Sequence, residues 1–279
     1  MSDLAFVSSF SNNVLVILDG LGDDDQQNGR WLEESVNDLS NKLHRPGYCT
    51  RFRVYDAKEL HATLKLIETD CKTGTTKPVL HFECHGDLEK GLFLARSGEY
   101  VGWQTLLRLI SGINIASRNN TGLVLASCNG FEITKLVRIN EPCSFHFALG
   151  PDTSVTAGEL KEEMTAFYRM IMATNNLNAA IAELKPHYKR FLCTEWLYLN
   201  FASFVVTNFS GKAKAAMAEK ILDNLVAMRS GRHLKDLRKR VKKHIKTPEI
   251  TFQDVSKTFL HSKKPVSYAQ FEAFVKQTH

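Results

Sequence analysis

Short apolar segments alternate with amphipathic helical segments along most of this chain of 279 residues. The apolar runs that predict strands span residues 14–18, 51–55, 79–84, 122–127, 144–149 and 195–199. Helical periodicity covers residues 30–43, 58–67, 103–110, 157–173 and 177–184. This alternation predicts an α/β fold, with a mostly parallel sheet and helices on both of its faces. In such sheets the functional site lies beyond the carboxyl ends of the strands.

Two residues with catalytic chemistry follow neighbouring predicted strands. His85 comes after the third strand and Cys128 after the fourth, so the two side chains can converge on one substrate. A thiolate nucleophile needs an acid or base beside it. We expect a helix at 131–139, whose N-terminus favours the thiolate form of Cys128. Gly86 leaves room for a substrate carbonyl, and its amide is a candidate oxyanion donor.

At these positions the chain resembles caspase-like peptidases, and more closely the CHAT branch related to separase. The similarity rests on residues 79–86 (VLHFECHG) and 123–130 (LVLASCNG), and on the pattern from Phe145 to Ala182. It covers residues 14–200 and implies a caspase-like fold with His85 as general acid/base, Cys128 as nucleophile and the Gly86 amide at the oxyanion. The resemblance further suggests a role in bacterial defence or regulated cell death. Ser154 departs from the pattern, since separase has aspartate there, so specificity cannot be carried over.

Other interpretations of the cysteines and histidines stay open at this point. An isolated cysteine is more often a buried core thiol, which is how we interpret Cys143 and Cys193. His81, Cys84 and His85 lie close enough in the sequence to suggest zinc, but strand alternation sends Cys84 to the opposite face. A magnesium-dependent phosphoryl-transfer site after the first strand has no further motif to support it. We therefore predict neither a metal nor another cofactor.

Acidic residues after two strands suggest a substrate pocket. Asp19 follows the first strand and Asp152 the fifth, and both are predicted to bind substrate. Their alternative role is in turns and helix caps. The run Asp23 to Asp25 reads as a solvated loop. An acidic pocket favours a substrate with a basic residue before the scissile bond, since a desolvated charge must be paired. Arg30 lies just beyond the acidic loop and would overturn this preference if its side chain turned into the pocket.

The net charge of +6 hides two regions of opposite sign. From Gly211 onward there are 16 Lys and Arg against 6 Asp and Glu, whereas the first 210 residues hold 20 against 24. We therefore predict a peptidase domain at 1–210 and a basic helical extension at 211–279. One apolar stripe of the extension comprises Leu234, Leu237, Val241 and Ile245. This helix either packs on the core domain or binds nucleic acid, an acidic membrane surface, or an activating partner or ligand. Nucleic acid is the less favoured ligand because aromatic residues for base stacking are sparse.

The sequence thus predicts a cysteine endopeptidase that cleaves a specific protein partner. The alternative is a non-catalytic caspase-like scaffold whose basic tail binds a partner or nucleic acid. No run of eighteen apolar residues and no signal-like N-terminus is present, so we expect a cytoplasmic protein without a transmembrane segment. The six cysteines form no CxxC pair, so a disulfide framework is not expected.

Overall fold

The computed structural model describes residues 10–154, 156–174, 176–186, 188–208, 248–261, 268–269 and 271. The chain divides into two compact units. The larger comprises Val7–Arg138 and Pro142–Cys193, and the smaller comprises Met1–Phe6, Ile139–Glu141 and Thr194–His279. The boundary expected near residue 210 therefore falls inside the smaller unit.

A six-stranded sheet forms the centre of the larger unit, with strand order β2-β1-β3-β7-β8-β9. The first five strands in this order are parallel to one another, and β9 runs antiparallel to β8. The expectation of a mostly parallel sheet is confirmed. The strands are β1 (Val14–Asp19), β2 (Cys49–Arg53), β3 (Pro78–Glu83), β7 (Gly122–Ala126), β8 (Phe147–Pro151) and β9 (Tyr188–Leu192).

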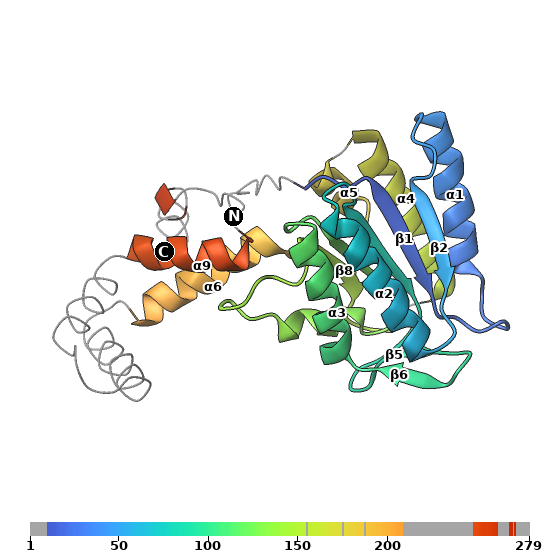
Figure 1. Cartoon of the computed structure of the whole chain (residues 1–279), viewed down its shortest axis with the longest axis horizontal. Coiled ribbons are helices and arrows are strands. Elements are labelled where there is room, and N and C mark those ends of the chain that lie inside the picture. Colours follow the sequence, from blue (N-terminus) through green and yellow to red (C-terminus); the bar gives the residue numbers. More distant parts are fainter. Residues whose placement is uncertain are drawn as a thin grey trace. The chain divides into compact units, whose positions relative to one another are not determined.

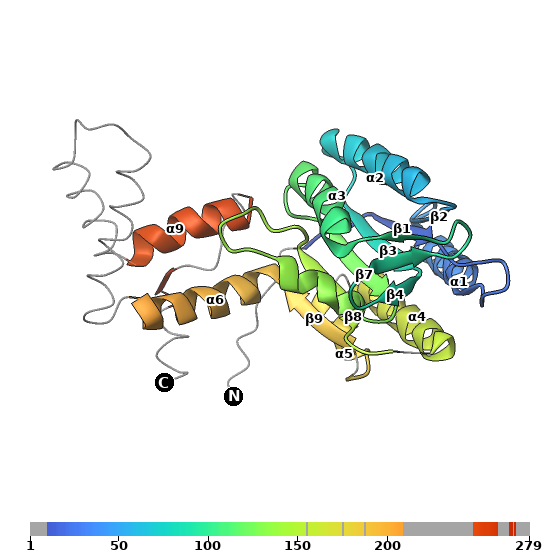
Figure 2. The ribbon, with the colours of Figure 1, turned by 90° about the horizontal axis from the view of Figure 1, so that it is seen from below.

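Helices cover both faces of this sheet (Figures 1 and 2). On one face lie α1 (Asn28–Lys42), α4 (Ala157–Thr174) and α5 (Leu177–Ala182); on the other lie α2 (Ala57–Lys72) and α3 (Trp103–Ala116). The central strands β1, β3 and β7 are buried along almost their whole length, as expected for strands covered on both sides. Burial of this apolar surface is the main force that holds the layers together.

A small antiparallel sheet follows β3 directly. It comprises β4 (His85–Asp87), β5 (Gly91–Leu94) and β6 (Glu99–Val101). His85 is its first residue, so the histidine lies where the chain leaves the large sheet and enters the small one.

The predicted sixth strand at 195–199 is wrong. These residues belong to α6 (Cys193–Asn208), and the sixth strand is β9, a few residues earlier. A short run rich in Trp, Tyr and Leu cannot be told from part of a buried helix by its periodicity. β9 was missed because Lys189 and Arg190 are exposed in its middle, as is usual for an antiparallel strand at a sheet edge.

Aromatic side chains form the core of the smaller unit. Trp196 of α6 stacks on Phe259 of α9 (Pro248–Phe259), and Phe201 packs edge-on against Phe252. Phe271 joins the same cluster by stacking on Phe252. Residues before position 209 and after position 247 thus share one core. The predicted basic helix with its stripe Leu234, Leu237, Val241 and Ile245 lies outside the described residues.

Within the part of the chain that the structure describes, no helix is long and apolar enough to cross a membrane.

Candidate active site

His85 and Cys128 meet at one edge of the large sheet. β3 and β7 are parallel neighbours, with Glu83 paired to Ala126 at their carboxyl ends. His85 and Cys128 each follow two residues later, and both line one pocket of about 170 Å³. Other walls of this pocket include Leu21, Asp25, Glu83 and Ala126. The convergence expected from the strand order is present, although no hydrogen bond joins the imidazole to the thiol within the described residues.

A close backbone contact explains how the two segments come together. A Cβ atom built on Gly86 would lie 1.9 Å from the carbonyl oxygen of Cys128 and 3.2 Å from Cβ of Ser127. Only glycine allows this approach, because real Cβ atoms cannot come so near a backbone oxygen. The His85-Gly86 step therefore packs directly on the backbone of the cysteine turn.

The turn after Cys128 differs from the predicted helix at 131–139. Asn129 adopts a left-handed conformation (φ 56°), and a 3₁₀-helix follows at Gly130–Leu136. The N–H of Asn129 donates to the carbonyl of Thr153, 3.3 Å away, which ties the turn to the loop after β8. Because this helix is a single short 3₁₀ segment, the argument that an α-helix dipole favours the Cys128 thiolate loses its basis.

Cys128 is the one cysteine of the six that is not buried. Burial raises the pKa of the Cys49 and Cys71 thiols to about 12 and raises those of Cys84 and Cys143 as well. Cys193 is buried too. Solvent and substrate therefore reach only the thiol beside His85, which is the setting that a reactive cysteine requires.

Asp25 holds the His85 ring. Its Oδ2 atom lies 3.1 Å from His85 Nε2 and accepts a hydrogen bond of 2.7 Å from the N–H of Gly22. Partial burial alone would raise the pKa of the Asp25 carboxyl, but these two partners outweigh burial and hold the pKa below its usual value. The carboxylate is therefore ionised at neutral pH, and it can fix the orientation of an imidazole whose other nitrogen stays free for chemistry.

Removing the Asp25 charge tests this role. For the endopeptidase that the sequence predicts, Asp25→Asn is expected to lower kcat for peptide cleavage by about 10- to 100-fold with little change in KM, because the amide no longer fixes the imidazole. The matched control is Asp24→Asn, since Asp24 has no hydrogen bond or ion pair within the described residues. Equal effects of both variants, or a rise in KM alone, would contradict a positioning role for Asp25.

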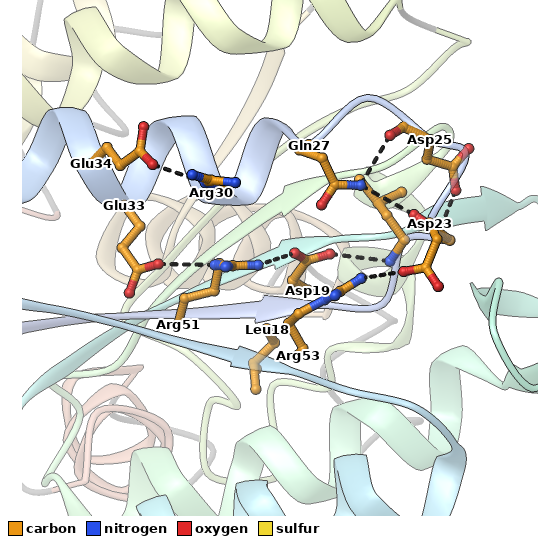
Figure 3. A network of polar contacts seen from close by, with 12 residues as sticks. Leu18, Asp19, Asp23, Asp25, Gln27, Arg30, Glu33, Glu34, Arg51 and Arg53 are labelled. Atoms are coloured by element: carbon orange, nitrogen blue, oxygen red, sulfur yellow. Dashed lines mark hydrogen bonds and ion pairs between the residues drawn. The ribbon is translucent and has the colours of Figure 1, made fainter.

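Asp19, a predicted substrate-binding residue, is occupied elsewhere (Figure 3). Its side chain is only 3% exposed; Oδ2 pairs with Arg51 Nη1 at 2.8 Å and Oδ1 accepts from the N–H of Leu21. Arg51 also pairs with Glu33 of α1 (Figure 3). This buried pair fastens β1 to β2, and Asp19 does not line the pocket of His85 and Cys128.

Asp152, the other predicted substrate-binding residue, lies in the loop after β8. Its carboxylate is 41% exposed and faces Lys189 of β9, with 3.6 Å between Oδ2 and Nζ. It does not line the pocket either. The charge of each predicted pocket carboxylate is thus already matched by a cation of the same unit.

In the acidic run from Asp23 to Asp25, the first and third carboxylates are paired, whereas Asp24 has no partner among the described residues and is exposed, as expected for a solvated loop. Asp23 contacts Arg53 at 2.7 Å and Arg96 at 3.1 Å. Gln27 donates to the carbonyls of Gly22 and Asp25, which braces the loop (Figure 3). The run also borders a second hollow of about 500 Å³ that reaches His85. Arg30, which was expected to be able to turn inward, instead pairs with Glu34 on the exposed side of α1.

His81, Cys84 and His85 turn in three different directions. His81 is fully buried and bonds Tyr168 and Glu83, each at 2.9 Å. The Cys84 thiol contacts the carbonyl of Leu18 on the opposite face, and His85 contacts Asp25. These three side chains therefore do not converge on one point, as a zinc site would require.

Sequence reasoning missed Asp25 and Glu83. Nothing in the acidic run distinguishes Asp25 from its neighbours, because a loop conformation selects it. Glu83 had a signal: it is a carboxylate in an otherwise apolar strand that alternates onto the same face as His81.

The chain matches no protein-family model, and a search of curated proteins finds no match to it either.

Proposed function

We propose that this chain is a caspase-like cysteine endopeptidase in which Cys128 is the nucleophile and His85 the general acid/base. One observation carries the proposal: His85 and the only cysteine that is not buried share a pocket at the ends of two neighbouring parallel strands. Pockets beyond the carboxyl ends of parallel strands are where α/β folds bind their ligands.

The proposed reaction is peptide hydrolysis in two steps. The Cys128 sulfur, as thiolate, adds to the scissile carbonyl carbon, and the tetrahedral intermediate collapses to a thioester as His85 gives a proton to the leaving amine. Water, deprotonated by His85, then hydrolyses the thioester and regenerates the thiol. Because Nε2 of His85 faces Asp25, we assign these proton transfers to Nδ1.

The amide of Gly86 is the proposed donor to the oxyanion. Its support is that the Gly86 backbone packs on the backbone of Cys128, so this residue lies beside the turn that carries the thiol. An oxyanion donor must be in place before the reaction and must not need to move during it. The tight packing at Gly86 favours a fixed position for its amide.

The parallel sheet with helices on both faces is compatible with the proposed caspase-like fold, and the motif resemblance favours the CHAT branch. On the same resemblance we propose a regulated role, with a specific protein partner as substrate, in bacterial defence or cell death. Six cysteines that are all free, one of them the nucleophile, fit a reducing compartment, so we propose the cytoplasm.

The alternative function is a non-catalytic scaffold that binds a partner or nucleic acid through its basic tail. The charge of the chain favours it, since the residues from Gly211 onward carry the whole positive excess. A scaffold gives no reason, however, for an accessible thiol beside a histidine held by a carboxylate.

Covalent labelling separates these two functions. A peptide that carries an acyloxymethyl ketone reacts rapidly with a catalytic thiolate and slowly with an ordinary thiol. We expect it to modify Cys128, as located by mass spectrometry, and we expect His85→Ala to slow the reaction strongly. Iodoacetamide serves as the control for simple access. If the two reagents labelled Cys128 equally in the wild type and in His85→Ala, the scaffold would be the better description.

A further inference from the structure

The pocket that His85 and Cys128 line (the dyad, below) has acidic residues in its walls. Its volume of about 170 Å³ is below the range for a whole small-molecule ligand, so it suits a single side chain. None of the described residues that line this pocket is Lys or Arg, whereas two of them, Asp25 and Glu83, are acidic. Asp25 is engaged with His85, which leaves Glu83 as the carboxylate that can meet a ligand.

Glu83 is the last residue of β3 and lies two residues before His85. It pairs across the sheet with Ala126, which in turn lies two residues before Cys128. Because these residues are paired in register on parallel strands, Glu83 and Ala126 point to the same face, and both line the pocket that His85 and Cys128 share. The Glu83 side chain is only 4% exposed, and that exposure is toward a pocket.

A buried chain of hydrogen bonds holds this carboxylate. Glu83 Oε1 lies 2.9 Å from Nε2 of His81, and Nδ1 of His81 lies 2.9 Å from the hydroxyl of Tyr168. The two ring nitrogens of His81 thus link the Glu83 carboxyl group to the Tyr168 hydroxyl group, and the tautomer of the ring decides which nitrogen donates. The chain fixes one oxygen of Glu83 and leaves Oε2 without a hydrogen bond among the described residues.

A buried carboxylate with one committed oxygen is costly unless a partner compensates its charge. We propose that Glu83 is the specificity-determining residue of this site and that it binds the lysine or arginine side chain that precedes the scissile bond. This inference rests on the proposed peptidase function. The predicted preference for a basic residue is kept, but Glu83 replaces Asp19 and Asp152 as its cause, because those two residues are paired with Arg51 and Lys189.

The competing side chains fare worse in this pocket. Aspartate or glutamate would place a second carboxylate beside Glu83 in a site without a cation. A neutral side chain of the same length would displace water from Glu83 and supply no counter-charge. Sites that bury a polar partner reject analogues that lack the matching group far more strongly than apolar pockets reject a methylene.

The test uses the full-length protein and matched fluorogenic peptides that differ only in the residue before the cut. The pairs are arginine against citrulline and lysine against norleucine, with aspartate as a fifth peptide. We expect wild type to cleave the arginine peptide at least about 100-fold faster than its citrulline partner, measured as kcat/KM. In Glu83→Gln, which keeps the shape and removes the charge, this ratio falls to within about threefold of unity. Asp152→Asn, the matched control outside the pocket, keeps the wild-type ratio.

Glu83→Asp guards against a merely structural effect. It keeps the charge, so a specificity role predicts that part of the arginine preference returns, whereas a packing defect would affect both members of each peptide pair equally. The inference is overturned if wild type prefers citrulline, norleucine or aspartate, or if Glu83→Gln keeps the preference for arginine. A wild type that cleaves none of the peptides and does not react with an acyloxymethyl ketone at Cys128 overturns the proposed function instead, and the inference with it.

Discussion

Cys128→Ala and His85→Ala are each expected to lower the rate of peptide cleavage about a thousandfold or more. In the proposed mechanism the nucleophile and its acid/base act as a unit, so the loss of either removes nearly all of the chemical catalysis. Neither change should unfold the protein, because His85 is half exposed and Cys128 is not fully buried. Single-turnover cleavage of a fluorogenic peptide measures the effect.

The larger unit offers matched controls for both substitutions. His61→Ala removes an exposed histidine of α2, and Cys71→Ala removes a buried cysteine from the same helix. Both should leave cleavage within about threefold of wild type, since neither residue lines the pocket of the dyad. Residual cleavage by purified Cys128→Ala at more than a few per cent of the wild-type rate would show that another group is the nucleophile.

Gly86→Ala is expected to lower the rate of cleavage by about a hundredfold, although it removes no functional group. The new methyl group would lie 1.9 Å from the Cys128 carbonyl oxygen, so the histidine segment and the cysteine turn must move apart. Overpacking of this kind costs about 1–3 kcal/mol of folding stability. A displacement of about 1 Å at reacting groups can lower the rate about a hundredfold. Thermal unfolding and kcat/KM measure the two effects.

Gly102→Ala is the matched control for this substitution. Gly102 precedes α3 with φ of −60°, and the only atom near an added Cβ is the carbonyl oxygen of Lys90 at 3.9 Å. Alanine fits there without a clash, and because Gly102 is the N-cap of α3 the loss of stability should be no more than about 1 kcal/mol. If Gly86→Ala folded and cleaved like Gly102→Ala, the close backbone contact would be disproved.

The sheet was predictable from the sequence because each of its buried strands is a short apolar run between helical segments. Val14–Asp19 and Pro78–Glu83 are examples. Asp19 ends the first of these strands, and His85-Gly86 follows the second. β9 and α6 were not predictable in the same way. Exposed Lys189 and Arg190 mask the strand, while Trp196 and Tyr198 give the helix the composition of a strand.

The same contrast holds for the site. That His85 and Cys128 converge follows from strand order alone. Which carboxylates surround them does not, because ion pairs depend on neighbours that are distant in the sequence. Asp19 forms an ion pair with Arg51, and Asp152 faces Lys189. The conformation of the acidic loop, in contrast, brings Asp25 to His85.

The contact at Gly86 also has a mechanical consequence. The carbonyl of Cys128 and the backbone of Gly86 abut with no side chain between them, so neither segment has slack with which to absorb a movement of the other. The turn after Cys128 is also joined to the loop after β8 by the hydrogen bond from the N–H of Asn129 to the carbonyl of Thr153. The segments that carry Cys128, Gly86 and His85 are therefore expected to move together, so a displacement of one of them displaces the other two.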